Sequence, residues 1–292
     1  MIKESFGTKA FNLANMAILT IVVIVTLYPI IYVLFASVSD PRLMVQHTGL
    51  LLKPLGFSDI GYKLLIQDAM IVRSFQNSAV ILAMGVSVNI SLTILGAYFL
   101  SRNNVYWKNL ILVIILITMY FSGGLIPLYI IVKSYGLYNT YFALVLPGAI
   151  STINMIILRT AFAAVPESLE QSARIDGAGH LTVLVHIMLP LALPTIAVIG
   201  LYYSVAHWNA WFGAMIFLKE RALYPLQLIL REKLILNQTV TSGSNLNSGD
   251  ENMVGETLKY AIIIISSIPM LCLYPFIQKY FVKGVMIGAL KG

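Results

Sequence analysis

The residues best suited to specific polar chemistry are concentrated in one stretch, residues 165–190. This loop holds nearly all of the charge between two long apolar segments, so it must lie in water rather than cross a bilayer. Pro166 and Glu167 are typical of a helix start, and Gly177 can supply the left-handed turn that ends a helix. We therefore predict two short helices joined by a hinge at Gly177.

The second of these helices is predicted to be amphipathic and to lead into the next apolar segment, which Pro190 would open. Its apolar face would consist of Leu181, Leu184, Val185 and Met188.

The chemistry that the loop offers is recognition rather than catalysis. Ser172, Ala173 and Gly177 are small, so a partner surface could approach them closely, while Arg174 and Asp176 flank them and could set register by charge pairing. One exposed pair contributes only about 0.2–1 kcal/mol, so docking would rest mainly on shape and apolar contact. The alternative is an ordinary amphipathic loop with no partner.

Catalytic constellations are absent from the sequence. It contains no Gly-x-x-x-x-Gly-Lys-Ser/Thr phosphate loop and no His-Glu-x-x-His or Gly-x-Ser-x-Gly motif. His180 and His186 share the loop, but no cysteine or other convergent ligand stands near them. We expect no catalytic residue, no metal site and no cofactor bound by this chain.

The elements that must hold the loop are apolar helices. Hydrophobic residues make up 59% of the chain and charged residues 11%, and the mean hydropathy is +0.85, well outside the range of soluble domains. Apolar segments free of Asp, Glu, Lys and Arg are long enough to cross about 30 Å of hydrocarbon as helices. The expected fold is an all-α membrane protein, a single domain over residues 1–292 with six transmembrane helices at 11–38, 74–100, 109–132, 135–158, 189–218 and 260–278.

Local signals modify this outline. Pro29 predicts a kink in the first segment, and Gly123-Gly124 predicts a break near the outer end of the third. The 39–73 connection has apolar periodicity around residues 62–72, which indicates a short helix. Residues 237–251 are rich in Asn, Ser, Thr and Gly and are predicted to be mobile.

Lysine and arginine in the short connections predict the orientation. Both termini and the 165–190 loop would face the cytoplasm, and the long connections at 39–73 and 219–259 would face outward. Anionic lipid headgroups and orientation explain the net charge of +7, so no nucleic-acid partner is expected. A single cysteine excludes an internal disulfide. The basic residues on the inner side would be Lys3, Lys9, Arg102, Lys108, Lys279, Lys283 and Lys291.

The loop resembles the "EAA" loop of the inner-membrane permeases of binding-protein-dependent ABC importers, with its pattern E-A-A-x-x-x-G, a spacer and I-x-L-P. Here Gln171, Ser172, Ala173 and Gly177 stand in that register, and the far end reads Ile187, Leu189, Pro190. Gln and Ser replace the first two pattern residues, which removes a charge that the family usually carries, although Glu170 is adjacent. The resemblance extends along the chain to carbohydrate-importer permeases, closest to those for complex or acidic oligosaccharides, through residues 121–127, 136–140, 146–148, 208–212, 224–227 and 283–292.

This resemblance implies a type I ABC importer permease fold in the bacterial cytoplasmic membrane, with the loop as a coupling helix between helices 4 and 5. It implies as partners an ATPase dimer that holds ATP and Mg, a second permease forming a heterodimer, an external solute-binding protein, an oligosaccharide substrate and membrane lipid. The residues expected to couple to the ATPase are Glu170, Gln171, Ser172, Ala173, Arg174, Ile175, Asp176, Gly177 and Ala178.

Candidates for the substrate path lie mainly in the fifth segment. Aromatic faces stack on sugar rings, and amide groups bond sugar hydroxyls, which suits a wet, partly apolar channel. The alternatives are that the tryptophans and Phe212 form an interfacial aromatic belt and that the intramembrane amides join helices. The candidates are Tyr202, Tyr203, His207, Trp208, Asn209 and Trp211, with Asn89 and Asn154 from other segments.

Other functions remain as alternatives. A permease of the same class could carry an amino acid, a peptide or phosphate. A stand-alone secondary transporter would need ionisable groups at membrane depth, whereas every Asp and Glu falls outside the six segments. A membrane-embedded hydrolase or transferase would need the catalytic motifs that are missing.

Overall fold

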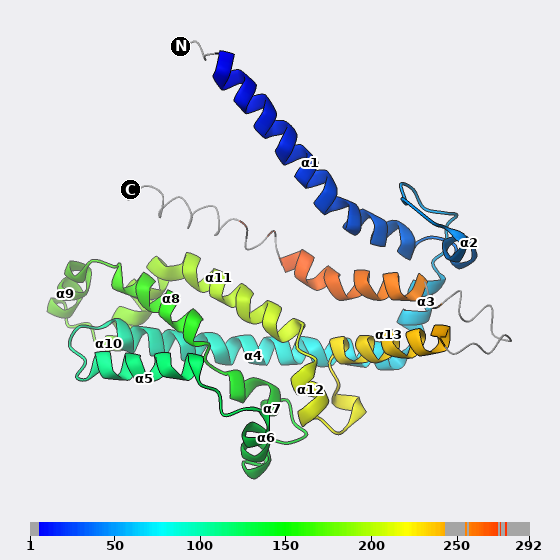
Figure 1. The fold of residues 1–292 in the computed structure, drawn as a ribbon. Helices are drawn as coiled ribbons and strands as arrows, with labels where there is room; N and C mark the ends of the chain where they lie inside the picture. The colour runs from blue at the N-terminus through cyan, green and yellow to red at the C-terminus, as the bar shows by residue number, and fades with distance from the viewer. Residues whose placement is uncertain (1–5, 243–254, 256, 274, 276–277, 279–292) are drawn as a thin grey trace. The chain divides into compact units, whose positions relative to one another are not determined.

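A computed structural model describes residues 6–242, 255, 257–273, 275 and 278, and these residues form helices and connections but no strand (Figure 1). The chain divides into two compact units. Of the described residues, 6–69, 231–242, 255 and 257–268 form the first, and 70–230, 269–273, 275 and 278 form the second.

The first unit begins with α1, Phe6–Ser37, a helix of 32 residues that overlaps the span expected at 11–38 and carries Pro29 inside it. The most apolar 18-residue stretch of α1 is 0% buried, so its surface is suited to contact lipid or another helix. Two short helices follow, α2 at Pro41–Gln46 and α3 at Ile60–Gln67. The Tyr62 hydroxyl in α3 donates to Ser37 Oγ at 2.7 Å. The short helix expected around residues 62–72 is therefore present, but it ends earlier.

A helix at Thr257–Leu273 follows, and its residues 257–268 belong to this unit. Tyr260 meets Tyr32 of α1 edge to face, with ring centroids 5.9 Å apart. The helix overlaps the sixth expected segment, 260–278, but begins earlier, and residues 279–292, including the basic tail, lie outside the described residues.

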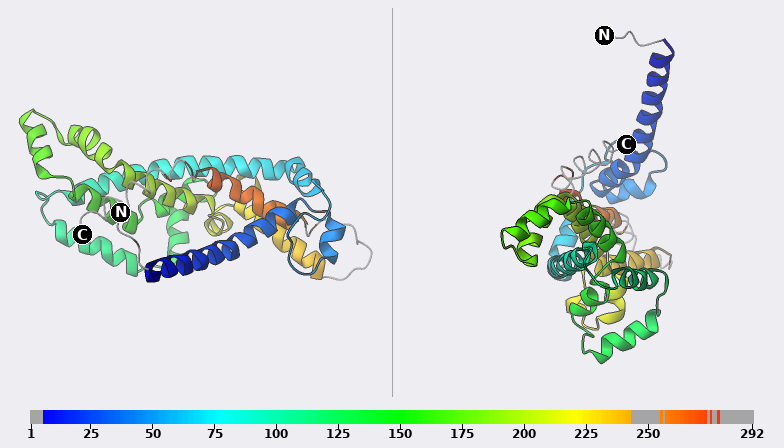
Figure 2. Two further views of the ribbon diagram at one scale, coloured as in Figure 1. Left: turned by 90° about the horizontal axis from the view of Figure 1, so that it is seen from above. Right: turned by 90° about the vertical axis from the view of Figure 1, so that its left-hand side faces the viewer.

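In the second unit, α4 at Ala69–Ser101, α5 at Lys108–Tyr120, α8 at Thr152–Ala163 and α11 at Leu189–Trp208 run alongside one another (Figures 1 and 2). Contacts join α8 to both α5 and α11. Many buried residues of α4 are small or polar, so the neighbouring helices can approach closely at Ser74, Ser78, Gly85, Asn89 and Thr93.

The main core of this unit lies towards the end of the bundle that carries the 165–190 loop. Phe162 of α8 is fully buried there and packs edge to face on Tyr98 of α4, with centroids 6.3 Å apart. The core positions α8 and α11, the two helices that flank the loop. Its buried members are Ala97, Tyr98, Leu100, Met155, Leu158, Phe162, Val183, Leu184, Met188, Ala192, Ile199 and Tyr203.

The third segment, expected at 109–132 with a break at its glycine pair, forms two helices. Helix α5 ends at Tyr120, and α6 begins again at Leu125 and runs to Ser134, after a turn of 113°. The break falls at the expected glycine pair, because Gly124 has a φ of +87°, which a residue with a side chain rarely adopts.

The fourth segment, expected at 135–158, is also broken and displaced. Its helical part begins with α7, Phe142–Val145, and a 3-10 turn at Leu146–Gly148, and α8 then starts after a 54° bend. The helix continues past Arg159, whose charge marked the expected end. Arg159 can stay within α8 because its Nε donates to the Leu100 carbonyl at 3.1 Å.

The fifth segment, expected at 189–218, is displaced in the other direction. One helical run extends from His180 to Trp208, formed by α10 at His180–Val183, a π turn at Leu184–Met188 and α11. Proline lacks the N–H that a regular helix needs, and the wider turn before Pro190 allows the helix to continue through it. The helix ends at Trp208, and α12 occupies Phe212–Phe217.

The π turn also changes which apolar side chains face inward. Leu184 and Met188 are buried as expected, but Leu181 is 72% exposed and Val185 is 50% exposed. The fully buried Val183 lies on the inner face instead, because the extra residue in the wide turn shifts the register of the face.

The connection expected at 219–259 is not simply a loop. It contains α13, Leu226–Ser242, and its residues 243–254 lie outside the described residues. By length and composition, three of the described helices can each cross a membrane, and the number rises to five if each bent pair counts as one span.

Candidate functional site

The 165–190 loop projects from one end of the α4, α5, α8 and α11 bundle, with α9 at Glu167–Ile175 outermost (Figure 1). Pro166 is its N-cap rather than its first helical residue, and Glu167 and Glu170 stand in the first turn. Negative charge at a helix N-terminus is favourable, so the local sequence specifies where α9 begins.

A Schellman motif ends α9. The Gly177 N–H donates to the Arg174 carbonyl at 3.1 Å, and the Ala178 N–H donates to the Ala173 carbonyl at 2.9 Å. Gly177 has a φ of +84°, as the sequence predicts for the residue that reverses the chain. The motif gives the end of α9 a defined shape two residues before the next helix begins.

Ala173 and Ala178, which the 2.9 Å bond joins, lie on the inner side and pack against the main core. Ala173 was expected to admit a partner, but it is the small residue that lets α9 approach its own bundle. No residue of α9 is fully buried, so the helix is attached by one face only.

The outer face of α9 is exposed. Ile175 is 86% exposed, although it is apolar and stands on a helix in the loop that must lie in water. Around Gly177, an added Cβ would meet no heavy atom of the described chain within 4 Å. Ile175 and the open space at Gly177 leave room for another molecule to contact α9 here. We define the α9 outer face as Gln171, Ser172, Ile175, Asp176 and Gly177, all of them exposed.

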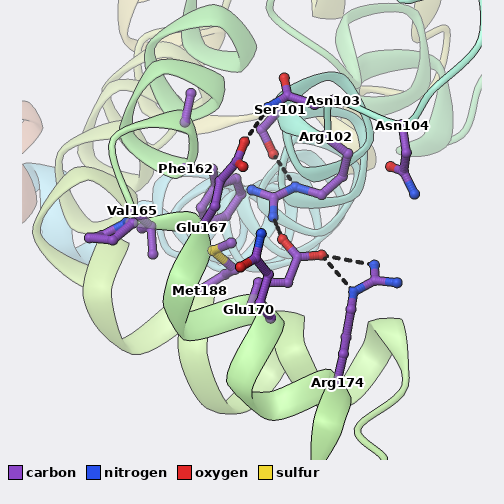
Figure 3. Close-up of a pocket in the computed structure, with 13 residues that line it drawn as sticks. Ser101, Arg102, Asn103, Asn104, Phe162, Val165, Glu167, Glu170, Arg174 and Met188 are labelled. Carbon is purple, nitrogen blue, oxygen red and sulfur yellow. Dashed lines mark hydrogen bonds and ion pairs between the residues drawn. The ribbon is translucent and has the colours of Figure 1, made fainter.

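The charged residues of α9 face the other way (Figure 3). The Glu170 carboxylate accepts from Arg102, which follows α4, and its side chain is 13% exposed. It also accepts from Arg174, through Nη2 at 2.8 Å and Nε at 3.1 Å. Arg174 lies 3.2 Å from His180 Nδ1 as well. Glu170 and Arg174 are thus engaged within the chain, which leaves Asp176 as the charged group on the outer face.

A second polar contact joins the same two segments. Asn103 donates to the Glu167 carboxylate, and its own oxygen accepts from Lys108 Nζ at 3.1 Å. The two contacts border a cleft of about 250 Å³ between the α4–α5 connection and α9, with Phe162 and Met188 at its apolar side (Figure 3).

Sequence reasoning missed Arg102 and Asn103 as parts of this site. It treated Arg102 only as a charge that orients the chain. The pair formed by Arg102 and Glu170 joins residues 68 positions apart, so no local spacing signals it.

Several substrate-path candidates lie in contacts between helices. The Tyr203 hydroxyl is 2.7 Å from Thr93 Oγ1 and accepts from the Ser151 N–H at 3.0 Å. Asn89 donates to the Gly148 carbonyl at 2.9 Å, and its oxygen lies 3.2 Å from His207 Nε2. These side chains bond backbone groups left open by the break between α7 and α8.

The remaining candidates do not converge with them on one cavity. Trp208 is 2% exposed and meets Phe75 edge to face, and Asn154 is buried in the first turn of α8. Tyr202 is 48% exposed, and exposed Asn209 donates back to the Val205 carbonyl at 2.9 Å. Trp211 packs on Phe212, with centroids 5.5 Å apart.

These features define a class of protein. Long apolar helices and two bent pairs of helices carry one polar helix, α9, outside the apolar region, and one face of α9 is exposed. Among the residues that the structure describes, no group of three or more His, Cys, Asp or Glu could hold a metal ion. These are features of an all-helical membrane protein.

The chain belongs to the family of binding-protein-dependent transport system inner membrane components, whose model matches residues 90–287. It is 36% identical to the polygalacturonan/rhamnogalacturonan transport system permease protein YtcP of Bacillus subtilis over 97% of this chain and 99% of that protein. It is 37% identical to the protein LplC of the same organism, over 97% and 96%.

Among solved structures, the chain is similar to a chain of a bacterial ABC transporter involved in the import of the acidic polysaccharide alginate. The TM-score is 0.84 and the identity 30%, over 96% of this chain and 100% of that one. The match confirms the resemblance to ABC importer permeases and the all-helical permease fold. The residue-level roles in coupling and in the substrate path stay predictions.

Proposed function

We propose that this permease forms half of the channel of an ATP-driven oligosaccharide importer. The proposed substrate is a fragment of an acidic plant or algal polysaccharide. YtcP and the alginate importer serve acidic polysaccharides, and both match nearly the whole chain. In this proposal the other half of the channel is a second permease in a heterodimer, and an external solute-binding protein delivers the substrate.

The observation that carries the mechanism is the α9 outer face. In this proposal α9 is the coupling helix, and a separate ATPase subunit binds the face formed by Gln171, Ser172, Ile175, Asp176 and Gly177. ATP and Mg are held by that ATPase dimer. The exposed Ile175 supplies apolar contact area, and Gly177 lets the partner approach the backbone.

The connections of α9 suit the transmission of movement. One helical run of 29 residues, His180–Trp208, begins two residues after the Schellman turn. On its other side α9 follows α8, which packs on α11. A shift of α9 would therefore move both helices as stiff elements, as in rigid-body transitions between packed states.

At the other end of α11, a polar cluster lies beside the α7–α8 break. It consists of Asn89, Tyr203 and His207. We infer that a tilt of α11 changes the channel at this polar cluster. The reason is that a helix break has fewer backbone hydrogen bonds to disrupt than a continuous helix has. The proposal includes six crossings, with both termini and α9 in the cytoplasm.

Reconstitution tests this function. The permease would be co-expressed with its candidate second permease and ATPase, purified as a complex and placed in proteoliposomes with the binding protein inside or outside. Oligogalacturonides and alginate oligosaccharides would be compared with maltotriose as probes. We expect the loaded binding protein to stimulate ATP hydrolysis at least tenfold with an acidic oligosaccharide, a difference of about 1.4 kcal/mol in activation free energy.

The outcome that overturns the oligosaccharide assignment is stimulation only by an amino acid, a peptide or phosphate. Failure of any ATPase to co-purify with the permease, while the two permeases still associate, would overturn the coupling role of α9.

A further inference from the structure

We propose that Arg102 is a positioning residue for α9: its buried ion pair with Glu170 holds α9 at one angle to the end of α4 and so presents the α9 outer face to the partner. The consequence for coupling rests on the proposed function. The tether itself can be tested on the purified permease without any partner.

Arg102 is itself held in place from the α4 side. Its Nε donates to Ser101 Oγ at 3.1 Å, and its guanidinium stands 5.0 Å from the centre of the Tyr98 ring. Ser101 Oγ donates in turn to the Tyr98 carbonyl at 2.7 Å, within the last turn of α4. A planar guanidinium fixed by a ring and a hydroxyl loses little freedom when it binds a carboxylate.

The pair is largely removed from water. The side chains of Arg102 and Glu170 are 10% and 13% exposed, so their attraction is weakly screened (Figure 3). Deleting Glu170 would leave the Arg102 charge shielded from water without its partner, and deleting Arg102 would leave Glu170 paired only with the more exposed Arg174. Either change is more disruptive than losing an exposed pair. The contact is thus strong enough to set a preferred orientation.

Arg174 provides the internal comparison. It binds the same carboxylate but lies four residues further along α9, with its side chain 41% exposed. Both ends of that pair are on α9, so it can stabilise the helix but cannot fix the helix relative to α4. Two arginines on one carboxylate therefore have different mechanical consequences.

Apart from these polar contacts, α9 is held to the bundle by small groups. Ala173 and Ala178 offer little side chain to prevent rotation, and none of the residues of α9 is buried. The second tether, from Asn103 to Glu167, is exposed and lies nearer the start of the helix. Arg102 is consequently the main determinant of the angle of α9. The carboxylate at position 170 is committed to this tether, and position 171 offers a partner an amide.

The first experiment is hydrogen exchange on the full-length permease in nanodiscs, comparing Arg102→Gln with Arg174→Gln. We expect Arg102→Gln to speed exchange of the α9 amides about tenfold or more, while peptides of α8 and α11 stay as in the wild type. Arg174→Gln should change α9 less than about threefold, and Arg102→Lys should restore only part of the protection, because it keeps the charge but lacks the planar guanidinium that Tyr98 and Ser101 hold. Equal effects of the two glutamine variants, or no effect of Arg102→Gln, would overturn the tether.

If Arg102→Gln does not accumulate, Ser101→Ala serves in its place, because it frees the guanidinium on the α4 side and leaves the charge pair intact. It should speed α9 exchange about threefold. Unchanged exchange in Ser101→Ala would count against the tether.

The second experiment measures ATP hydrolysis by the reconstituted complex. Arg102→Gln should keep basal hydrolysis but lose at least tenfold of the stimulation by loaded binding protein, while Arg174→Gln keeps most of it. If the wild type is stimulated and Arg102→Gln and Arg174→Gln lose stimulation equally, the positioning role of Arg102 is refuted, but the proposed function is not. Absence of any stimulation in the wild type, with the exchange difference intact, would refute the proposed function and leave the tether standing.

Discussion

Gly177→Asp should leave the permease folded in the membrane while abolishing uptake. The backbone at this position has a φ of +84°, where a residue other than glycine costs about 1–2 kcal/mol, with aspartate near the lower end. The new Cβ meets nothing of the described chain within 4 Å, so no steric term adds to this cost. The total is a small fraction of the stability of a folded domain, typically about 5–15 kcal/mol.

The effect on docking should be much larger than the effect on folding. The open space at Gly177 lies on the α9 outer face beside Asp176, so aspartate there would fill the approach path and add a second negative charge. Burying that carboxylate against a partner without a counter-charge costs several kcal/mol. A loss of even about 2.8 kcal/mol weakens binding about a hundredfold, because each 1.4 kcal/mol is a factor of ten.

Two variants control for the change. Gly179→Asp introduces the same charge two residues away, where the backbone φ is −76° and an added Cβ again has open space among the described residues. Gly177→Asn has almost the same size and backbone cost as Gly177→Asp but no charge. Membrane levels measured by immunoblot should be similar for all three, whereas co-purified ATPase and oligosaccharide uptake should fall most for Gly177→Asp. Normal uptake in that variant, at wild-type ATPase occupancy, would refute the reasoning.

Three further results are expected. Ile175→Asp should reduce ATPase co-purification at least tenfold. It should leave the thermal unfolding of the isolated permease unchanged, because Ile175 is 86% exposed. A large fall in the midpoint temperature of unfolding would mean that Ile175 packs within the chain. Tyr203→Phe should destabilise the permease by about 1–3 kcal/mol, since the Ser151 N–H and Thr93 lose a buried partner, as a thermal shift in detergent would reveal. Gly85→Ala places a Cβ 2.4 Å from His207 Nε2 and should also destabilise the protein by about 1–3 kcal/mol. The double variant Gly85→Ala/His207→Ala should recover this stability. If Gly85→Ala were as stable as the wild type, the His207 ring would be free to move aside.

Much of the outline was predictable from the sequence because its causes are local. Apolar runs without charge locate α1 and α4 to within a few residues. The turn at Gly177 follows from the need for a left-handed residue after α9, and the break at Gly123-Gly124 follows from the same conformational freedom. The family resemblance also rests on short-range spacing, from Gln171 to Gly177 and on to Pro190.

The predicted helix ends were less accurate where a distant part of the chain offsets a residue that locally disfavours the helix. Arg159 marks an end by charge alone, yet the Leu100 carbonyl accepts its hydrogen bond and α8 continues. Pro190 marks a start by its missing N–H, yet the π turn before it lets one helical run pass through. In both cases the local rule is correct, and a contact or a change of helical register overrides it.

The identity of the protein as a membrane permease and the position of its exposed turn were determined by the sequence alone, because composition and short-range spacing act within a few residues. Only the tertiary structure decided what each polar side chain does. It turned Glu170 inward to Arg102, 68 positions away, and used Asn89 and Tyr203 to bond the backbone at the α7–α8 break. Such pairings depend on which helices become neighbours, and that is decided by packing over the whole bundle.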